Sequence, residues 1–267
     1  MAISLEGKTA IVTSTPQSVG TAIAQKFVEA GANVMLAACD DRKATCGVIE
    51  GDSAQIERFS FALQDKLCIT NLIAATVNRF ERIDILVNAV QNTSDPGTFL
   101  DVGTDQFDAA FGDNVRGVFQ LSQAVARRMI EQREKDDPGK DTSAIVNISS
   151  IAARRTVPGL LAYSVSCAAL DQLTRSMAAS MAQYGVRVNG VALGSVLTER
   201  LRIAFRENAD LRDDMIAVTP MGRLADTEEA AETVLFLASP HAAYITGQIV
   251  SVDGGRTLLD PLASPIR

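Results

Sequence analysis

Short runs of hydrophobic residues alternate along the whole chain with longer segments in which hydrophobic and polar positions repeat at helical spacing. Buried parallel strands are nearly all apolar and surface helices are amphipathic, so this alternation predicts a series of strands and helices. The expected strands cover residues 8–13, 33–38, 59–63, 83–88, 144–149, 186–193 and 248–252. The expected helices cover residues 19–30, 66–80, 105–133, 163–184 and 227–238, with a charged loop at 134–141.

The repeated alternation of apolar strand and amphipathic helix indicates a parallel sheet that is covered on both faces. We therefore expect an α/β fold, a Rossmann-like, doubly wound sheet of about seven parallel strands with helices on both faces. No linker, repeat or low-complexity segment interrupts the pattern, so residues 1–267 are expected to form a single domain. Ligands of such folds bind at the carboxyl ends of the strands.

Composition and charge narrow the classes of function. Hydrophobic residues make up 47% and charged residues 21% of the 267 residues, as in ordinary globular proteins. The net charge of −7 argues against a nucleic-acid partner, which would require a basic face. The sequence shows no apolar run long enough to span a membrane and no signal peptide, so we expect a cytoplasmic protein without a membrane partner.

Cysteine and histidine content restricts the chemistry further. Cys39, Cys46, Cys68 and Cys167 lack the spacing of metal ligands, so we expect four reduced thiols and no metal site. The chain has a single histidine, His241, which is expected in a loop between a helix and a strand. A Ser-His-Asp triad or a histidine-rich metal site is therefore not expected.

The most informative stretch follows the expected strand at 144–149. Ser150 ends that strand, Tyr163 comes 13 residues later, and Cys167 lies one helical turn after Tyr163. This spacing resembles the short-chain dehydrogenase/reductase family, in which a Ser, a Tyr and a Lys four residues after the Tyr interconvert a carbonyl and an alcohol. Ser150 and Tyr163 match that pattern, and Asn114 matches the family's Asn on the long helix. Cys167 stands in the place of the Lys.

The resemblance implies a role for each of these residues. Ser150 would steady the substrate oxygen, Tyr163 would exchange the proton, and Asn114 would hold a water molecule. The family's Lys lowers the pKa of the Tyr: a cation about 4 Å away contributes roughly 4 kcal/mol at an effective dielectric constant near 20, or about 3 pKa units. Cys167 cannot replace it, because a free thiol has a pKa of about 8.5 and its thiolate has the wrong sign. We therefore expect a remnant of a catalytic site.

Each of these residues also has a purely structural interpretation. Ser150 can close a strand end, and Tyr163 can be an ordinary aromatic residue at the start of a helix. Asn114 can bond to local backbone at a helix kink. Cys167 can pack as a small hydrophobic residue. The sequence leaves these alternatives open.

The first strand-to-helix turn is the expected site for the pyrophosphate of a dinucleotide. The resembling family has Gly where this chain has Ser14 and Ser18, and Gly20 is retained. Each serine adds a Cβ atom where bare backbone approaches the phosphates. Positive φ angles at these serines would cost about 1–3 kcal/mol each, so we expect a turn of different shape.

Other expected cofactor contacts depart from the family as well. Ala38 and Cys39 replace the residue that binds the adenosine ribose, and Asp40 follows one or two positions late. Ala62 replaces an adenine-contacting Asp, and Gln91 adds bulk where Gly lets the cofactor approach. The matching positions are Gly20, Asn88, Val196 and Thr198. The resemblance implies NAD or NADP as the cofactor of the family, with weak or no binding by this chain.

These departures favour a catalytically degenerate member of the family. We expect it to be a structural or regulatory partner of an active NAD(P)-dependent alcohol dehydrogenase or ketoreductase paralogue in a tetramer. The chain is similar in this respect to the inactive subunits of heteromeric members such as 2-[hydroxy(phenyl)methyl]succinyl-CoA dehydrogenase. Two alternatives stay open: an active oxidoreductase that uses Tyr163, Ser150 and Asn114 without the Lys, and a small-molecule binding or sensor module.

Two further segments bear on partner and substrate. The family commonly assembles through the helix that begins near Tyr163, where small residues give a face suited to close packing: Ala168, Ala169, Ala178, Ala179 and Ala182. In the family a lid covers the substrate, and here it corresponds to residues 198–220, a stretch of mixed charge. Its arginines, with Arg154 and Arg155, either receive a carboxylate or CoA phosphates or belong to a solvated surface.

Overall fold

The computed structural model describes residues 2–16, 18–39, 46–93, 97–134, 143–208 and 210–258, except for the side chains of 49–53. One eight-stranded sheet runs through it in the order β3-β4-β2-β1-β5-β6-β7-β8. The strands are β1 Thr9–Ser14, β2 Asn33–Ala38, β3 Gly47–Ser53, β4 Ile56–Ser60, β5 Ile85–Asn88, β6 Ser143–Ser150, β7 Val186–Leu193 and β8 Ile249–Val252. Every pairing is parallel except that of β3 with β4.

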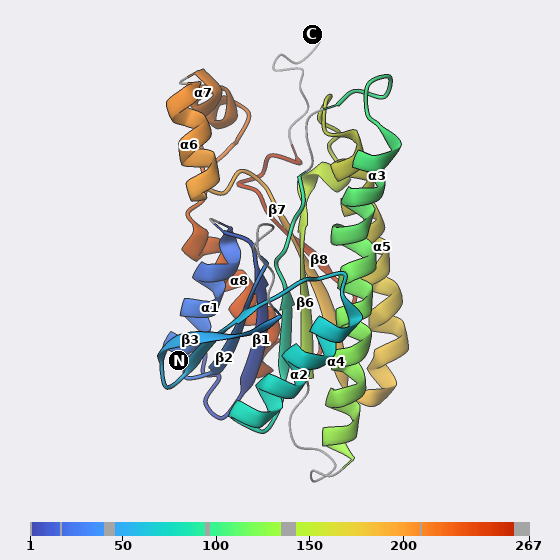
Figure 1. The fold of residues 1–267 in the computed structure, drawn as a ribbon. Helices are drawn as coiled ribbons and strands as arrows, with labels where there is room; N and C mark the ends of the chain where they lie inside the picture. Colours follow the sequence, from blue (N-terminus) through green and yellow to red (C-terminus); the bar gives the residue numbers. More distant parts are fainter. Residues whose placement is uncertain are drawn as a thin grey trace.

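Helices cover both faces of this sheet (Figure 1). They are α1 Val19–Glu29, α2 Lys66–Phe80, α3 Thr104–Phe111, α4 Val118–Arg133, α5 Leu161–Met181, α6 Glu199–Glu207, α7 Asp210–Ala217 and α8 Thr227–Ala238. Four short turns are η1 Gly112–Gly117, η2 Ile151–Ala153, η3 Ala182–Tyr184 and η4 Pro240–Ala242. The structure confirms the expected doubly wound α/β fold.

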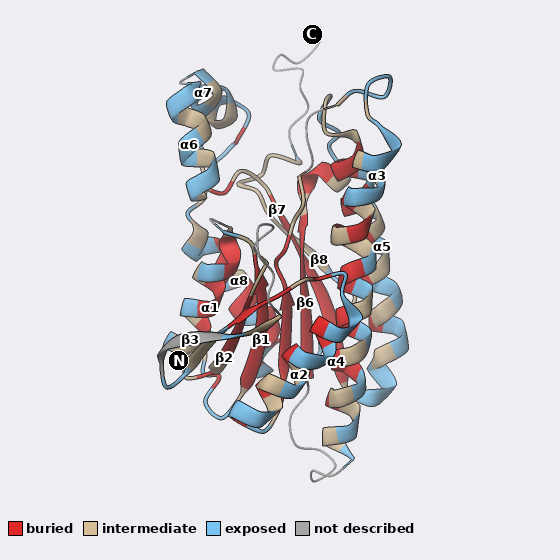
Figure 2. Ribbon diagram, in the orientation of Figure 1, coloured by how far each residue is buried: buried red, intermediate tan, exposed pale blue. Residues whose placement is uncertain are grey.

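The apolar strands separate two hydrophobic clusters, one on each face of the sheet. Ile23 and Phe27 of α1 pack with Val234 of α8 in the first cluster. Leu72 of α2 and Leu121 of α4 belong to the second. Burial is concentrated in the strands and in the helix faces that contact them (Figure 2). The two clusters explain why the strands are apolar along their whole length.

The edge strand β3 is a correction to the sequence prediction, which contained about seven strands and none at Gly47–Ser53. This strand pairs only with β4, antiparallel and with a shift in register. It carries two glycines and polar residues, because an edge strand need not be apolar. The hydrophobic pattern therefore gave no signal for it.

The prediction of one long helix at 105–133 is also wrong, because this stretch consists of α3, a π-helical turn and α4. The π-helical turn η1 begins and ends with glycine. A Cβ atom at Gly112 would lie 2.8 Å from Gln64 Nε2, and one at Gly117 would lie 2.5 Å from Leu63 Cγ. The two glycines therefore let this turn approach the loop before α2. The charged loop expected at 134–141 lies almost wholly outside the described residues.

The expectation of four reduced thiols is wrong, because Cys46 and Cys68 form a disulfide. Cys39 and Cys167 are not part of a disulfide in the described residues. The sequence could not show the pairing, since it depends on the start of β3 lying against the first turn of α2. His241 lies in η4 between α8 and β8, as expected.

Segment 198–220 contains α6 and α7, which stand at the end of the sheet where β6 and β7 terminate (Figure 1). Neither helix has a buried residue among those described. None of the described helices combines the length and the apolar character that crossing a membrane would require.

Candidate active site

The carboxyl end of β6 and the first turns of α5 bring three of the predicted site residues together. Ser150 ends β6, and its hydroxyl accepts a hydrogen bond from the backbone N–H of Ala152 at 3.2 Å. Tyr163 and Cys167 lie on the inward face of α5 and pack with Ala152 in a small buried cluster. The structure thus confirms that the strand end and the helix converge.

The hydroxyl of Tyr163 is hydrogen-bonded to Gln91, which follows the carboxyl end of β5. It donates a hydrogen bond to Gln91 Oε1 at 3.1 Å, and Gln91 Nε2 in turn donates to the carbonyl oxygen of Ile148 at 3.2 Å. Gln91 follows β5 where the resembling family has Gly. The sequence pointed to bulk at this position, but its bond to Tyr163 depends on the distance between two strand ends and could not be predicted.

Burial dominates the electrostatics of Tyr163, whose side chain is 6% exposed. Burial raises the pKa of Tyr163 far above its ordinary value, and the neighbouring Cys167 raises it further. The Ser150 hydroxyl and Arg200 lower this pKa by less. The phenol is therefore neutral at pH 7, and its pKa is shifted in the direction opposite to that produced by a neighbouring Lys.

Cys167 is also neutral. Burial raises the pKa of its thiol to about 12, while hydrogen bonding from Tyr163 lowers it by less. The next turn of α5 holds a buried acid, Asp171, rather than a base. Burial raises the pKa of Asp171 as well, and its Oδ1 atom has no hydrogen-bond partner. This stretch of α5 therefore supplies no positive charge to Tyr163.

Asn114 lies in the π-helical turn η1 and is bonded within the chain. Its Oδ1 accepts from the backbone N–H of Asn92 at 2.7 Å, and its Nδ2 donates to the Asn92 carbonyl at 2.9 Å. The same Nδ2 lies 2.9 Å from Ser166 Oγ, which donates to the Tyr163 carbonyl at 2.8 Å. Asn114 thus ties the loop after β5 to the helix that carries Tyr163. Sequence reasoning missed Asn92 and Ser166, because their contacts span distant parts of the chain.

Two serine hydroxyls fill the turn between β1 and α1. Ser18 is the N-cap of α1, and its Oγ accepts from the Gly20 N–H at 3.3 Å. Ser14 Oγ lies 3.1 Å from Ser18 Oγ and donates to the Thr15 carbonyl at 3.0 Å. In the described chain the positive-φ residues other than glycine are Cys46 and Glu81, so neither serine carries the strain of a positive φ angle. That the turn differs in shape from the family's stays a prediction.

Gly20 remains glycine because α1 packs closely on β1. A Cβ atom at Gly20 would lie 2.7 Å from the Cβ of Ser14 and 2.9 Å from the carbonyl oxygen of Thr13. The third family glycine is thus retained for helix–strand packing.

The other predicted cofactor residues have partners inside the chain. Asn88 Nδ2 donates to Asn147 Oδ1 at 2.8 Å within the buried sheet. Val196 packs into the first hydrophobic cluster. Thr198 is the N-cap of α6 and accepts from the Leu201 N–H at 3.3 Å. Residual cofactor contacts from these residues remain predictions.

The two positions expected to contact adenosine also lack the family's side chains. Ala38 ends β2, and the Ala62 N–H donates to Cys68 Sγ at 3.2 Å. Asp40 lies outside the described residues.

The residues at these strand ends do not fit a nicotinamide dinucleotide. A helix N-terminus binds phosphate through free N–H groups, and Ser18 already caps α1. Ser14 adds a second hydroxyl to the same turn, and the amide of Gln91 lies against the hydroxyl of Tyr163. The hydroxyl of Ser18 thus bonds an N–H group at the expected phosphate end, and the amide of Gln91 bonds the Tyr163 hydroxyl at the expected reactive end.

Five of the arginines near the site have partners within the chain. Arg154 donates to Ser251 Oγ at 3.2 Å, and Arg155 donates to the Thr257 carbonyl at 2.6 Å. In α6 and α7 the ion pairs are Arg202–Glu199, Arg206–Glu199 and Arg212–Asp213. These contacts favour the interpretation of segment 198–220 as a solvated surface of mixed charge.

Known proteins resemble this chain over nearly its whole length. A family model described as enoyl-(acyl carrier protein) reductase matches residues 13–257. The 3-oxoacyl-[acyl-carrier-protein] reductase FabG of Thermotoga maritima is 32% identical over 258 residues, which are 94% of this chain and 98% of that protein. The oxidoreductase UcpA of Salmonella typhimurium is 33% identical and covers 95% of this chain and 96% of its own.

A solved structure with a similar fold is also of a reductase of this type. The 3-ketoacyl-(acyl-carrier-protein) reductase of Brucella melitensis, crystallised with NADH, superposes with a TM-score of 0.81 at 28% identity. The superposition covers 95% of this chain and all of that one.

Proposed function

Because this chain belongs to the short-chain dehydrogenase/reductase family of oxidoreductases, we propose that it is a non-catalytic member that acts as a partner subunit of an active NAD(P)-dependent paralogue. The observation that carries the proposal is the environment of Tyr163. Its phenol is buried, is bonded to Gln91 and has Cys167 where a Lys would lower its pKa. A phenol in that state is a poor general acid–base catalyst near pH 7.

The turn before α1 supports the same proposal. Ser14 and Ser18 place two hydroxyls at the start of the helix, and that of Ser18 accepts from the Gly20 N–H. On this proposal the chain lacks both cofactor binding and the proton-transfer group. The α/β fold itself is intact, so the chain retains a surface for assembly.

A groove on the outer face of α4 and α5 supports a partner subunit. It has a volume of about 390 Å³. Its apolar lining includes Phe119, Ala126, Ile130, Leu173, Met177 and Met181. The proposed partner is an active paralogue in a tetramer, as in heteromers such as 2-[hydroxy(phenyl)methyl]succinyl-CoA dehydrogenase, and the proposed setting is the cytoplasm.

The test is to purify the chain from its native source with any bound reductase and to compare the complex with the isolated chain. We expect the isolated chain to turn over no alcohol or ketone in a panel with NAD(P)(H). We expect the complex to be active and to stay within twofold of that activity when this chain carries Tyr163→Phe. A homo-oligomer without a co-eluting reductase, or turnover by the isolated chain that Tyr163→Phe abolishes, would overturn the proposal.

A second candidate is an active ketoreductase, which the relatives called 3-oxoacyl-[acyl-carrier-protein] reductase favour. In this case Ser150 would hold the substrate oxygen, Tyr163 would donate the proton, and Asn114 would position Tyr163 through Ser166. The isolated chain would then reduce a 3-oxoacyl thioester, and Cys167→Lys would raise its turnover. An inert wild type on such thioesters excludes this candidate.

A further inference from the structure

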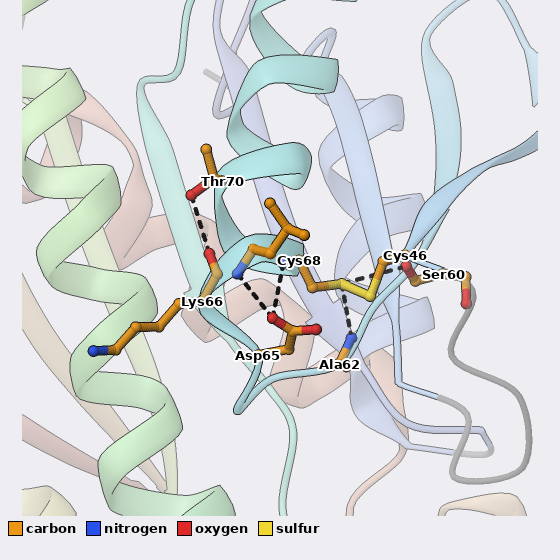
Figure 3. The surroundings of a disulfide bond; sticks show 8 residues. Cys46, Ser60, Ala62, Asp65, Lys66, Cys68 and Thr70 are labelled. Carbon is orange, nitrogen blue, oxygen red and sulfur yellow. Dashed lines mark hydrogen bonds between the residues drawn. A yellow bond between two sulfur atoms is a disulfide. The ribbon is translucent and has the colours of Figure 1, made fainter.

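The disulfide lies beside the loop that leads into α2. It joins Cys46, just before β3, to Cys68 in the first turn of α2, across a sequence separation of 22 residues (Figure 3). Cys68 is buried and Cys46 is half-buried. A thiol from solution therefore reaches the sulfur of Cys46 more readily than that of Cys68.

Cys68 is placed to leave as a thiolate. It lies in the N-terminal turn of α2, where the helix dipole favours negative charge. Its Sγ atom accepts a hydrogen bond from the Ala62 N–H at 3.2 Å. The carboxylate of Asp65, which caps the same turn, opposes this effect. A disulfide with a stabilised leaving thiolate exchanges readily with other thiols.

The loop beside Cys68 contacts the turn that carries Asn114. Leu63 and Gln64 lie against Gly117 and Gly112 so closely that a Cβ atom at either glycine would collide with them. Gln64 Nε2 donates to Asp113 Oδ1 at 2.6 Å and Gln64 Oε1 accepts from Arg116 at 2.8 Å. Both partners of Gln64 belong to η1.

The path continues from η1 to the candidate active site. Asn114 in η1 bonds to the backbone of Asn92 and to Ser166, which bonds to Tyr163. A continuous series of contacts therefore joins the disulfide to Tyr163. It passes through the 62–64 loop and η1.

We infer that Cys46–Cys68 is a reversible thiol–disulfide site whose oxidation state controls how firmly the 62–64 loop holds the π-helical turn that carries Asn114. Reduction breaks the covalent cross-link between the residue before β3 and the first turn of α2. The edge strand β3 is then held by its pairing with β4 and by its packing against α2. The inference is independent of whether the chain turns over a substrate.

A small thiol such as glutathione can reduce the Cys46–Cys68 disulfide by thiol–disulfide exchange. Its thiolate attacks Cys46 Sγ, the bond between the two sulfurs breaks, and Cys68 leaves as a thiolate that takes up a proton. A second glutathione thiolate attacks the mixed disulfide on Cys46 and releases the Cys46 thiol. In sum, two glutathione thiols are oxidised to glutathione disulfide and two protein thiols form. Glutathione disulfide reverses the reaction.

The first test counts thiols. The native chain is equilibrated with a series of reduced-to-oxidised glutathione ratios, unfolded in acid, alkylated and weighed by mass spectrometry. We expect two alkylated cysteines at the oxidised end, four at the reduced end, and the same midpoint from both directions. Four thiols at every ratio, or two thiols that resist reduction in the folded protein, would overturn the inference.

The second test measures amide hydrogen exchange in the oxidised and the reduced chain. On reduction we expect at least tenfold faster exchange at residues 61–65 and 112–117, with α8 unchanged, and a melting temperature lower by roughly 5–10 °C. The variant Cys46→Ser should match the reduced chain under oxidising conditions, and Cys39→Ser should match the oxidised wild type. Equal exchange at residues 112–117 in the two states would show that the disulfide does not reach the site.

Discussion

At the scale of single residues, the chemistry of the candidate site depends on what surrounds one phenol. Tyr163 has a hydroxyl partner in Ser150 and a positioning contact through Ser166, as a proton-transfer site requires. It also has Gln91 against its hydroxyl and a neutral thiol one turn away. No residue of α5 is among the groups that lower the pKa of Tyr163.

Cys167→Lys is expected to reverse the shift in the pKa of Tyr163. An ammonium group about 4 Å from the phenol contributes roughly 4 kcal/mol at an effective dielectric constant near 20, so the pKa should fall by about 3 units. Ultraviolet titration of phenolate, with the curve of Tyr163→Phe subtracted, measures this fall. Cys167→Met is the uncharged control, and the pKa of Tyr163 should stay high in this variant. Identical titrations of the two variants would contradict the electrostatic explanation.

Asp171 gives a pH dependence of stability with a defined sign. Its folded-state pKa is raised from about 3.8 by burial, so the folded chain binds this proton more tightly than the unfolded chain. Its contribution to stability is therefore present at low pH and is lost as pH rises above 3.8 through the folded pKa.

Asp171→Asn should remove this dependence. It keeps the shape of the side chain and cannot ionise. We expect a gain of about 1 kcal/mol or more in unfolding free energy at pH 7 and a smaller gain near pH 4, measured by urea denaturation. Asp108→Asn, at an exposed position of α3, is the control and should change neither value by more than about 0.5 kcal/mol. Equal gains for Asp171→Asn at both pH values would contradict a raised pKa for Asp171 in the folded chain.

The sequence pointed to Ser150, Tyr163 and Asn114 because they match the pattern of the resembling family. It could not identify the bond between Tyr163 of α5 and Gln91 after β5, because the two residues are far apart in sequence and only the fold brings them together. The buried position of Asp171 was equally hidden, since a polar residue on a helix usually marks the solvated face.

At the scale of elements, the start of α1 decides whether a phosphate can bind. An N-cap hydroxyl and a bound phosphate compete for the same N–H groups. Ser18 supplies that hydroxyl, and Ser14 extends from β1 to meet it. One N–H group of the helix N-terminus, that of Gly20, is therefore bonded within the chain.

Ser14→Gly combined with Ser18→Gly should reopen this turn. We expect nucleotide affinity to rise by at least tenfold, measured by calorimetry with NADH, because the freed N–H groups can bind phosphate. Glycine at an N-cap costs only a few tenths of a kcal/mol relative to serine, so the fold should persist.

The matched control is Ser14→Ala with Ser18→Ala, which removes both hydroxyls and keeps both Cβ atoms. It should gain less than the glycine pair. No gain with either pair would show that the serines are not what closes the turn.

Elements with strong periodicity were predicted to the residue, among them β2, α2, β7 and α8. The two failures have physical causes. The edge strand β3 pairs with β4 alone and contains two glycines and polar residues, so its sequence shows no apolar run. The π-helical turn η1 keeps nearly the hydrophobic spacing of an α-helix, and only its contact with the 62–64 loop explains its two glycines.

At the scale of the whole molecule, an eight-stranded sheet with a hydrophobic cluster on each face forms over the described residues. The proposal places the change in function at the strand ends and leaves this core as it is. The groove on α4 and α5 is then the surface through which such a chain would act on a partner.

Leu173→Glu should weaken that association. Leu173 lines the groove, and a carboxylate there would have to be desolvated at an interface. Light scattering of the native complex should show at least a tenfold weaker association. Ile203→Glu, on the exposed α6, is the control and should assemble like the wild type. An unchanged complex in the Leu173 variant would place the partner elsewhere.

The most direct test of the central claim is a calorimetric titration of the isolated, oxidised chain with NADH and with NADPH. The account predicts no binding of either nucleotide up to millimolar concentration, because Ser14, Ser18 and Gln91 occupy the two ends of the cleft. Micromolar binding of either nucleotide would contradict it and would leave the active ketoreductase as the function to pursue.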